Sequence, residues 1–318
     1  MGMLLDGSWV NDDPEMTGQG GTFQRPHSTF RAAIGDADHP AEAGRYHLFT
    51  APTCPWAHRT LIARRIKKLE AIISVTEADQ PKHQGWTFSD GIDDLQPVNG
   101  KLYLHQVYST VVPDFTGRVT VPVLWDRKTH SIVNNESSDI LRMLDSAFND
   151  IAPASFDYYP APLREQIDAL NSTLYDTINN GVYRCGFAKS QEAYDAAFDA
   201  LFSALDTLDD RLGRSRYLIG DQITECDIRL FTTLVRFDAV YVSHFKCNRN
   251  RISDFEHLGQ YLRDLYQTPG FGDTVDMPQI KRGYFAEHRH INPTGIIPQG
   301  PALDFTAPHD RAQMSSAA

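Results

Sequence analysis

The stretch Tyr46-His47-Leu48-Phe49-Thr50-Ala51-Pro52-Thr53-Cys54-Pro55 decides the fold of the N-terminal half of this chain. Its residues up to Ala51 predict a short strand that ends at Pro52. Pro55 suits the first position of a helix, because its missing N–H is no loss there. A second strand is expected at 72–75, so the order strand, helix, strand predicts a parallel βαβ unit. The helix between them is indicated by apolar residues at helical spacing, namely Leu61, Ile62, Ile66 and Leu69.

Two further strands are expected later in the same half. The run 119–125 is strand-like but contains Pro122. Because proline cannot occupy a central ladder position, Pro122 marks the start of a strand, with a cis peptide bond as one option. Residues 131–133 are the expected hairpin partner, and 134–139 open a helix. The long segment 78–117 is expected to form loops and short pieces.

Beyond residue 160 the apolar pattern becomes helical. Spacings of three and four residues run through 163–178 and through 194–212, which predicts amphipathic helices on a shared core. Thr224 is the expected N-cap of another helix, because Asp227 three residues later completes a capping box.

The spacing of apolar residues also indicates the structure of the final part of the chain and the domain boundaries. A last helix is expected around 255–266, and the stretch from Met277 is expected to be irregular. The Gly- and Pro-rich start of the chain carries little periodicity, so it either wraps the domain or is partly mobile. The chain divides into an N-terminal extension over 1–44, an α/β domain over 45–147, a helical domain over 160–275 and a C-terminal tail over 276–318.

Composition excludes several classes of function. The chain has 30 Lys and Arg against 41 Asp and Glu, a formal charge of −11, so we expect no nucleic-acid or anionic-membrane partner. Its four cysteines form no C-x-x-C pair, which favours reduced thiols in the cytoplasm over a secreted disulfide scaffold. Residues 1–11 do not have the pattern of a signal peptide, and no apolar run approaches the length of a membrane span.

Cys54 is the candidate nucleophile. It stands directly before a helix, where free backbone N–H groups and the helix dipole favour the thiolate over the thiol. His58 and Arg59 add positive charge nearby. The alternative is a buried, inert cysteine that acts as a small apolar residue.

The motif Cys54-Pro55-Trp56-Ala57 has alanine where a dithiol enzyme has its second cysteine. A monothiol must form a mixed disulfide with an outside thiol, and another outside thiol must release it. Glutathione is the abundant candidate. A metal site is not expected, because Cys54 and His58 offer two ligands and zinc needs three or four.

Several long motifs resemble the glutathionyl-hydroquinone reductases, also called xi-class glutathione transferases. The resemblance covers roughly residues 45 to 310. The segments that carry it are Cys54-Pro55-Trp56-Ala57-His58-Arg59, Gly85-Trp86-Thr87-Phe88, Thr116 to Asp126, Asn135-Glu136-Ser137, Asn180 to Arg184, Gly186-Phe187-Ala188, Ile280-Lys281-Arg282 and Ile291 to Pro298.

The resemblance implies a thioredoxin-like N-terminal domain, an all-α glutathione-transferase C-terminal domain, a C-terminal tail near the active site and a homodimer. It also implies a reaction in which the Cys54 thiolate takes glutathione from a glutathionyl-hydroquinone and a second glutathione releases oxidised glutathione. Five residues match those that contact glutathione in this family: Trp86, Arg118, Val121, Glu136 and Ser137.

Tyr183 and Tyr284 match tyrosines that face the aromatic substrate. A phenol there donates to a hydroquinone oxygen or transfers the proton that the ring carbon receives. The family usually has His-Tyr-Tyr after Ile-Lys-Arg, whereas this chain has Gly283-Tyr284-Phe285. The substrate preference is therefore expected to differ.

Each matched residue also has a purely structural interpretation. Val121 can start a strand, Glu136 and Ser137 can cap a helix, Arg118 can form a surface salt bridge, and the aromatic residues can fill a core. Two other functions remain open at this point. One is an omega-type thiol transferase or dehydroascorbate reductase that uses the same Cys54. The other is a non-catalytic dimeric binding module, against which a thiol at a helix start counts.

Overall fold

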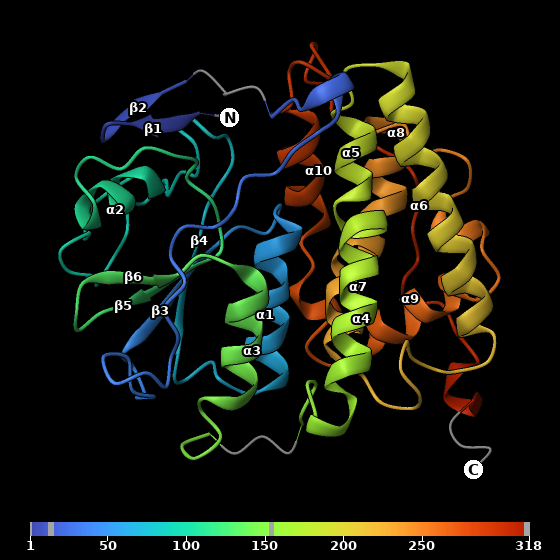
Figure 1. Ribbon diagram of the computed structural model, residues 1–318, viewed down its shortest axis with the longest axis horizontal. Helices are drawn as coiled ribbons and strands as arrows, with labels where there is room; N and C mark the ends of the chain where they lie inside the picture. The colour runs from blue at the N-terminus through green and yellow to red at the C-terminus, as the bar shows by residue number, and fades with distance from the viewer. Residues whose placement is uncertain (1, 12–15, 153–155, 315–318) are drawn as a thin grey trace. The chain divides into compact units, whose positions relative to one another are not determined.

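The computed structural model describes residues 2–11, 16–152 and 156–314. The chain forms two compact units (Figure 1). The first comprises Met1–Met16, Arg25–Phe156 and Pro278–Gly283. The second comprises Thr17–Gln24, Asp157–Met277 and Tyr284–Ala318.

The first unit is built on a mixed four-stranded sheet in the order β4-β3-β5-β6. Strands β3 (Tyr46–Thr50) and β4 (Ser74–Glu77) are parallel and are linked by helix α1 (Pro55–Ile66). Strand β5 (Val123–Asp126) runs antiparallel to β3 and to β6 (Ser131–Asn134).

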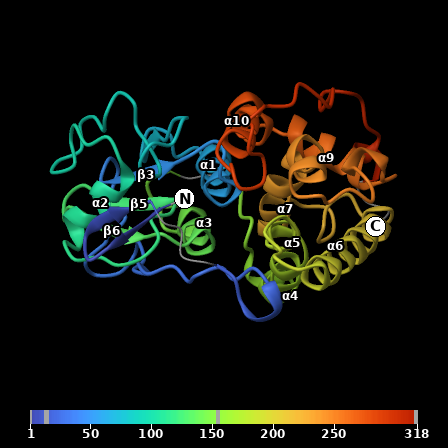
Figure 2. The ribbon, with the colours of Figure 1, turned by 90° about the horizontal axis from the view of Figure 1, so that it is seen from above.

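Three helices flank this sheet. Helices α1 and α3 (Ser137–Ser146) lie together on one face, and α2 (Leu104–Val111) lies on the other (Figure 2). The predicted βαβ unit is therefore confirmed. The second strand begins two residues later than expected, and β5 begins directly after Pro122, the proline that the sequence analysis placed at the start of a strand.

Helix α2 corrects the expectation of loops over 78–117. It escaped the sequence pattern because Tyr103 is not a usual N-cap residue. The Gln106 carboxamide oxygen accepts hydrogen bonds from the backbone N–H groups of Leu102 and Tyr103 at 3.0 and 3.1 Å, which satisfies the start of the helix.

The second unit is helical. All residues of its central helix, α7 (Glu225–Arg236), are buried. This helix begins with the predicted capping box of Thr224 and Asp227. The helices of this unit are α4 (Arg164–Leu174), a π-helical turn (Tyr175–Asn179), α5 (Gly181–Gly186), α6 (Gln191–Leu212), α7 (Glu225–Arg236), a second π-helical turn (Phe237–Tyr241), α8 (Val242–His244) and α9 (Leu258–Gln267).

The described residues also form short 3₁₀ helices at Gln19–Gly21, Ala161–Leu163, Ile252–Asp254, Gly272–Thr274 and Arg311–Met314.

Helix α10 (Met277–Phe285) corrects the expectation that the chain is irregular from Met277. Its sequence contains Pro278 near the start and Gly283 inside, and both residues suggest an interruption. Proline is tolerated in a first helical turn, and Gly283 is required by a close neighbour described below.

The N-terminal extension begins with a hairpin of β1 (Met3–Leu5) and β2 (Ser8–Val10), in which Leu4 also pairs with Gly117. Further along, the extension follows β6. The Ala32 N–H donates to the Val133 carbonyl at 3.0 Å, and the Asn135 N–H donates to the Phe30 carbonyl at 3.1 Å.

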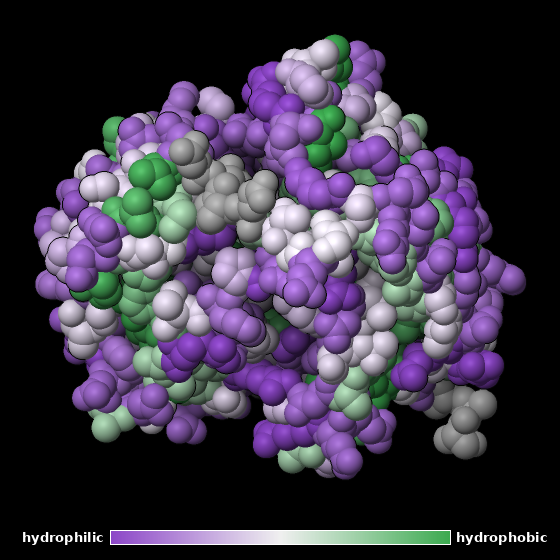
Figure 3. All heavy atoms as spheres, turned by 45° about the horizontal axis from the view of Figure 1, so that its top comes forward, coloured by the Kyte–Doolittle hydropathy of each residue, from purple (hydrophilic) through white to green (hydrophobic). Residues whose placement is uncertain are grey.

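The surface in Figure 3 is mostly hydrophilic, with small scattered apolar spots. Within the described ranges, no helix combines the length and apolar character that a bilayer crossing requires.

Candidate active site

Cys54 is the N-cap of α1, as the sequence predicts, and Pro55 is the first helical residue. Its backbone N–H donates to the Ala51 carbonyl at 3.0 Å, which forms the tight turn after β3. The Cys54 Sγ lies 3.7 Å from the Val121 carbonyl oxygen. The Val121–Pro122 bond is cis, which was the option left open. The structure therefore brings two predicted site residues, Cys54 and Val121, into contact.

The first turn of α1 is flanked by two cationic side chains. The guanidinium groups of Arg59 and Arg25 lie 4.4 and 4.7 Å from the centre of the Trp56 ring. Arg59 is 2% exposed, and its Nη1 lies 3.5 Å from the Ser137 hydroxyl. Arg59 thus reaches from α1 toward the start of α3.

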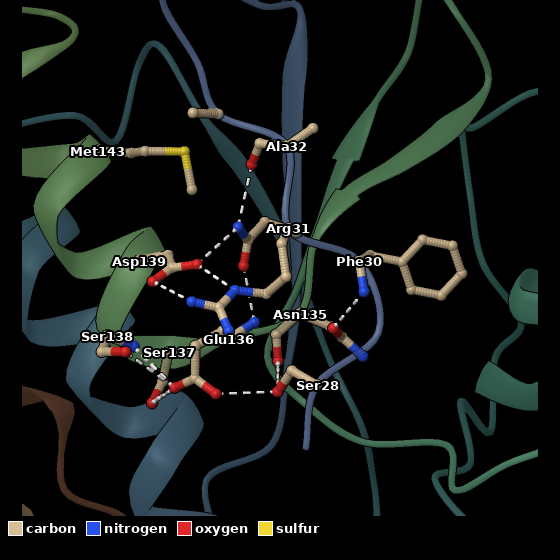
Figure 4. Close-up of polar contacts among 12 residues, drawn as sticks. Ser28, Phe30, Arg31, Ala32, Asn135, Glu136, Ser137, Ser138, Asp139 and Met143 are labelled. Carbon is tan, nitrogen blue, oxygen red and sulfur yellow. Dashed lines mark hydrogen bonds and ion pairs between the residues drawn. The ribbon is translucent and has the colours of Figure 1, made fainter.

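Glu136 is the N-cap of α3, and its carboxylate is held on both oxygens (Figure 4). Oε1 accepts from the N–H and the hydroxyl of Ser138 at 3.1 and 3.0 Å, while Oε2 accepts from the Ser28 hydroxyl at 2.9 Å. Burial raises the pKa of Glu136, but these hydrogen bonds outweigh it, so the net pKa lies below the usual value. Glu136 is therefore a preorganised anion at neutral pH.

The neighbour of this carboxylate, Ser137, is 3% exposed, and its hydroxyl lies 3.5 Å from Glu136 Oε1. Glu136 and Ser137 thus open α3 together, as the sequence predicts. The backbone N–H of Ser138 is already engaged by Glu136, so this helix start leaves less of its backbone to a ligand than expected.

The two remaining predicted glutathione contacts lie in different surroundings. Trp86 is 9% exposed and belongs to the apolar cluster that contains Cys54 and Val121. The Lys82 ammonium lies 3.9 Å from the centre of the Trp86 ring. Arg118 contacts the N-terminal extension, with its Nη1 2.9 Å from the Met16 sulfur.

The second unit holds a buried cluster of phenols. The hydroxyls of Tyr183 on α5 and Tyr284 on α10 are 2.6 Å apart, so the structure brings these two predicted residues together. Tyr241 is a third member, with its hydroxyl 3.0 Å from that of Tyr284. Burial and the neighbouring phenols raise the pKa of Tyr241 and of Tyr284 well above the usual value, so both keep their protons at neutral pH.

Aromatic rings surround these hydroxyls. Phe245 lies 5.4 Å from Tyr183 and 5.8 Å from Tyr284, measured between ring centroids. His288 lies 5.5 Å from Tyr284, and its Nδ1 is 3.1 Å from His244 Nε2. Across the parts of the chain that the structure describes, no three His, Cys, Asp or Glu side chains are grouped as metal ligands.

Comparison with known proteins gives the same two-part division. The glutathione S-transferase N-terminal domain model matches residues 53–147, and the C-terminal domain model matches residues 191–264. The glutathionyl-hydroquinone reductase YqjG of Escherichia coli is 48% identical over 98% of both chains.

Solved structures of similar proteins indicate the same family as the sequence comparison. A xi-class glutathione transferase from Natrialba magadii is 46% identical over 99% of this chain and 98% of that chain, with a TM-score of 0.91. The chain belongs to the xi-class glutathione transferases, the glutathionyl-hydroquinone reductase family. The glutathione-bound structure of YqjG from Escherichia coli K-12 is 46% identical over 98% of this xi-class chain and 99% of that one, with a TM-score of 0.87.

The structure shows what constrains Gly283, which the sequence analysis singled out. A Cβ atom added to Gly283 would lie 1.7 Å from the Thr53 hydroxyl, which is far inside contact distance. The same hydroxyl donates to the Gln279 carbonyl at 3.2 Å, so Thr53 occupies the groove of α10. A side chain at 283 would therefore require the Thr53 side chain to move.

Two polar residues of this xi-class chain were missed by sequence reasoning. Ser28 lies in a segment without periodicity, and its contact with Glu136 spans 108 residues. Tyr241 lies in a run of apolar residues that indicates only helix packing. Neither carries a local signal of its role.

Proposed function

We propose that this protein is a glutathionyl-hydroquinone reductase that works through a mixed disulfide between Cys54 and glutathione. The observation that carries the proposal is the position of the Cys54 sulfur at the start of α1, 3.7 Å from the Val121 carbonyl. A peptide thiol that pairs with the Val121 backbone would present its sulfur to Cys54. Glutathione is such a thiol, and the family resemblance and a glutathione-bound relative support it.

The reaction proceeds in two displacements that balance. The Cys54 thiolate attacks the sulfur of the glutathionyl group, an S–S bond forms, and the C–S bond to the aromatic ring breaks. The electron pair stays on the ring carbon, which takes up a proton, and the hydroquinone leaves. A second glutathione thiolate attacks the mixed disulfide, releases oxidised glutathione and restores the Cys54 thiolate.

The residues that we propose to hold glutathione are those that match the glutathione contacts of the family. The Glu136 carboxylate binds the ammonium group of the γ-glutamyl end, and Ser137 binds its carboxylate. Trp86 and Arg118 complete the glutathione contacts. Glu136 suits its role because its lowered pKa keeps it charged.

The tyrosine cluster is the source of the proton for the ring carbon. Tyr284 contacts both other phenols, so a proton lost from one hydroxyl is replaced along the hydrogen bonds. The raised pKa of Tyr284 keeps it protonated until the carbanion develops.

The test is an intact-mass measurement of the protein after mixing with one equivalent of a glutathionyl-hydroquinone. We expect a gain of one glutathione together with release of the hydroquinone, and neither in the Cys54→Ser variant. A second assay uses the mixed disulfide of glutathione and 2-mercaptoethanol. If only that disulfide turns over, the protein is an omega-type thiol transferase and the proposal is wrong.

The oligomeric state and the cellular location are part of the same proposal. We propose a homodimer, on the family resemblance, and a cytoplasmic enzyme. All four cysteines are free thiols, as a reducing, glutathione-rich compartment requires.

A further inference from the structure

The N-terminal extension contributes a hydroxyl to Glu136, the residue that we assign to the glutathione ammonium group. Ser28 Oγ lies 2.9 Å from Glu136 Oε2 and 3.3 Å from the Asn135 carbonyl. A hydroxyl has one proton, and the shorter contact to a charged acceptor is the stronger hydrogen bond. Ser28 therefore donates to Glu136.

This contact is held in register by the backbone. The extension runs antiparallel to the end of β6, with Arg31 paired to Asn134. The Phe30 N–H also donates to the Asn135 side-chain oxygen at 3.1 Å. These bonds hold the segment beside the start of α3, with the Ser28 hydroxyl directed at Glu136 (Figure 4).

Two anchors fix the segment on either side of the sheet edge. Arg31 makes a bidentate ion pair with Asp139 of α3, at 2.5 and 3.0 Å (Figure 4). The Phe30 ring packs on Tyr108 and Phe115, with centroid distances of 5.7 and 5.9 Å. Ser28 is therefore carried by a rigid segment rather than by a free end.

The two oxygens of Glu136 are held by different parts of the chain. Oε1 accepts hydrogen bonds from Ser137 and Ser138 of α3, whereas Oε2 accepts one from Ser28 of the extension. The terminal torsion of a glutamate is broad, so one fixed oxygen leaves the carboxylate plane free to turn. The Ser28 bond removes that freedom.

We infer that Ser28 is a positioning residue for glutathione: it orients the Glu136 carboxylate toward the ammonium group of the γ-glutamyl end. The N-terminal extension is thus a part of the glutathione site. This inference rests on the proposed role of Glu136.

The primary experiment compares kinetics of the Ser28→Ala variant with the parent enzyme on a glutathionyl-hydroquinone. We expect KM for the conjugate to rise about tenfold, equivalent to about 1.4 kcal/mol. We expect kcat to change less than about twofold, because Ser28 does not touch the thiol. The Ser28→Thr variant retains the hydroxyl and should restore KM. Thr29→Ala is the matched control, since Thr29 is the exposed neighbour in the same segment.

A pH profile separates orientation of the carboxylate from a general loss of structure. The charged groups around Glu136 are Arg59 of α1 and Arg31 of the extension, which is paired with Asp139. The Ser28 bond lowers the pKa of Glu136, so its loss should move the acidic limb of kcat/KM to higher pH. Thr29→Ala should leave that limb in place.

The outcomes are decisive in each direction. An unchanged KM in Ser28→Ala, an unmoved acidic limb, or a Ser28→Thr variant as weak as Ser28→Ala would overturn the inference. Glu136→Gln must raise KM at least as much as Ser28→Ala; if it does not, the role of Glu136 and the inference both fall. If the parent enzyme turns over only the glutathione–mercaptoethanol disulfide, and Ser28→Ala still raises KM for it, the proposed function fails while the inference stands.

Discussion

The thiol turn of the first unit and the tyrosine cluster of the second unit place ionisable groups in opposite environments. Cys54 is the N-cap residue of α1, and its sulfur lies 3.7 Å from the Val121 carbonyl oxygen. Tyr284 is 3% exposed among aromatic rings, where burial favours the neutral, protonated form. The difference shows how one chain keeps its thiol at a helix start, apart from a cluster of phenols that burial holds in the protonated form.

The strongest test of this comparison removes the thiol. Cys54→Ser should lower the rate of hydroquinone release at least about 1,000-fold, because a serine hydroxyl does not ionise at neutral pH. Thermal unfolding should be nearly unchanged.

Cys226 is the matched control for this variant. It is fully buried in α7, and burial raises the pKa of its thiol, so it stays protonated. Cys226→Ala should lower stability by about 1–2 kcal/mol and leave turnover per folded molecule intact. Comparable losses of turnover in both variants would contradict the special position of Cys54.

The next test removes the proton donor. Tyr284→Phe should slow hydroquinone release about 100-fold, since a positioned general acid contributes about 100- to 10,000-fold. Turnover of the glutathione–mercaptoethanol disulfide should be unaffected, because no carbon is protonated there. Equal losses on the two substrates would show that Tyr284 serves only packing.

A third test probes the close approach of α10 to the thiol turn. Gly283→Ala should destabilise the protein by about 1–3 kcal/mol, because the new methyl group overlaps Thr53. Thr53→Gly combined with Gly283→Ala should recover part of that loss. Urea unfolding of the two single variants and the double variant gives the coupling free energy, and strict additivity would contradict the contact.

The smallest expected effect concerns the surroundings of the phenols. Burial lowers the pKa of His244 to about 4, with His290 and Lys246 adding positive charge. The unfolded chain binds this proton near pH 6.5 and the folded protein does not, so His244 removes stability as pH falls from about 6.5 toward 4.

His244→Phe should therefore reduce the proton uptake on unfolding near pH 5 by about one proton. Urea unfolding at several pH values measures this as a shallower slope of stability against pH. An unchanged slope would mean that His244 is charged in the folded protein.

The sequence was most informative where the structural cause is local. A proline after Cys54, and Thr224 with Asp227, indicate helix starts through contacts within one turn, and both helices begin there. Helix α10 was missed because Gly283 weakens the helical pattern, and the reason for that glycine lies at Thr53, 230 positions earlier in the chain.

In the candidate site, too, the sequence predicted residues with local signals and missed those that depend on long-range contacts. Cys54 carries a local signal, and the family resemblance adds Glu136 and the two tyrosines. Ser28 and Tyr241 act through contacts that only the folded chain creates, at separations of 108 and 43 residues. Propensity and spacing do not encode such contacts.

The pairing of the extension with β6 also covers an edge at which another chain could add a strand. Strand β6 is the last strand of its sheet, and an uncovered edge strand is a template for pairing with another chain. The bonds from Phe30 and Ala32 occupy that edge. A protein shortened to begin at Glu42 would therefore expose β6, and it would also lose Leu4 and Phe30, which pack in or against the apolar cluster of the first unit. We expect such a protein to aggregate during expression.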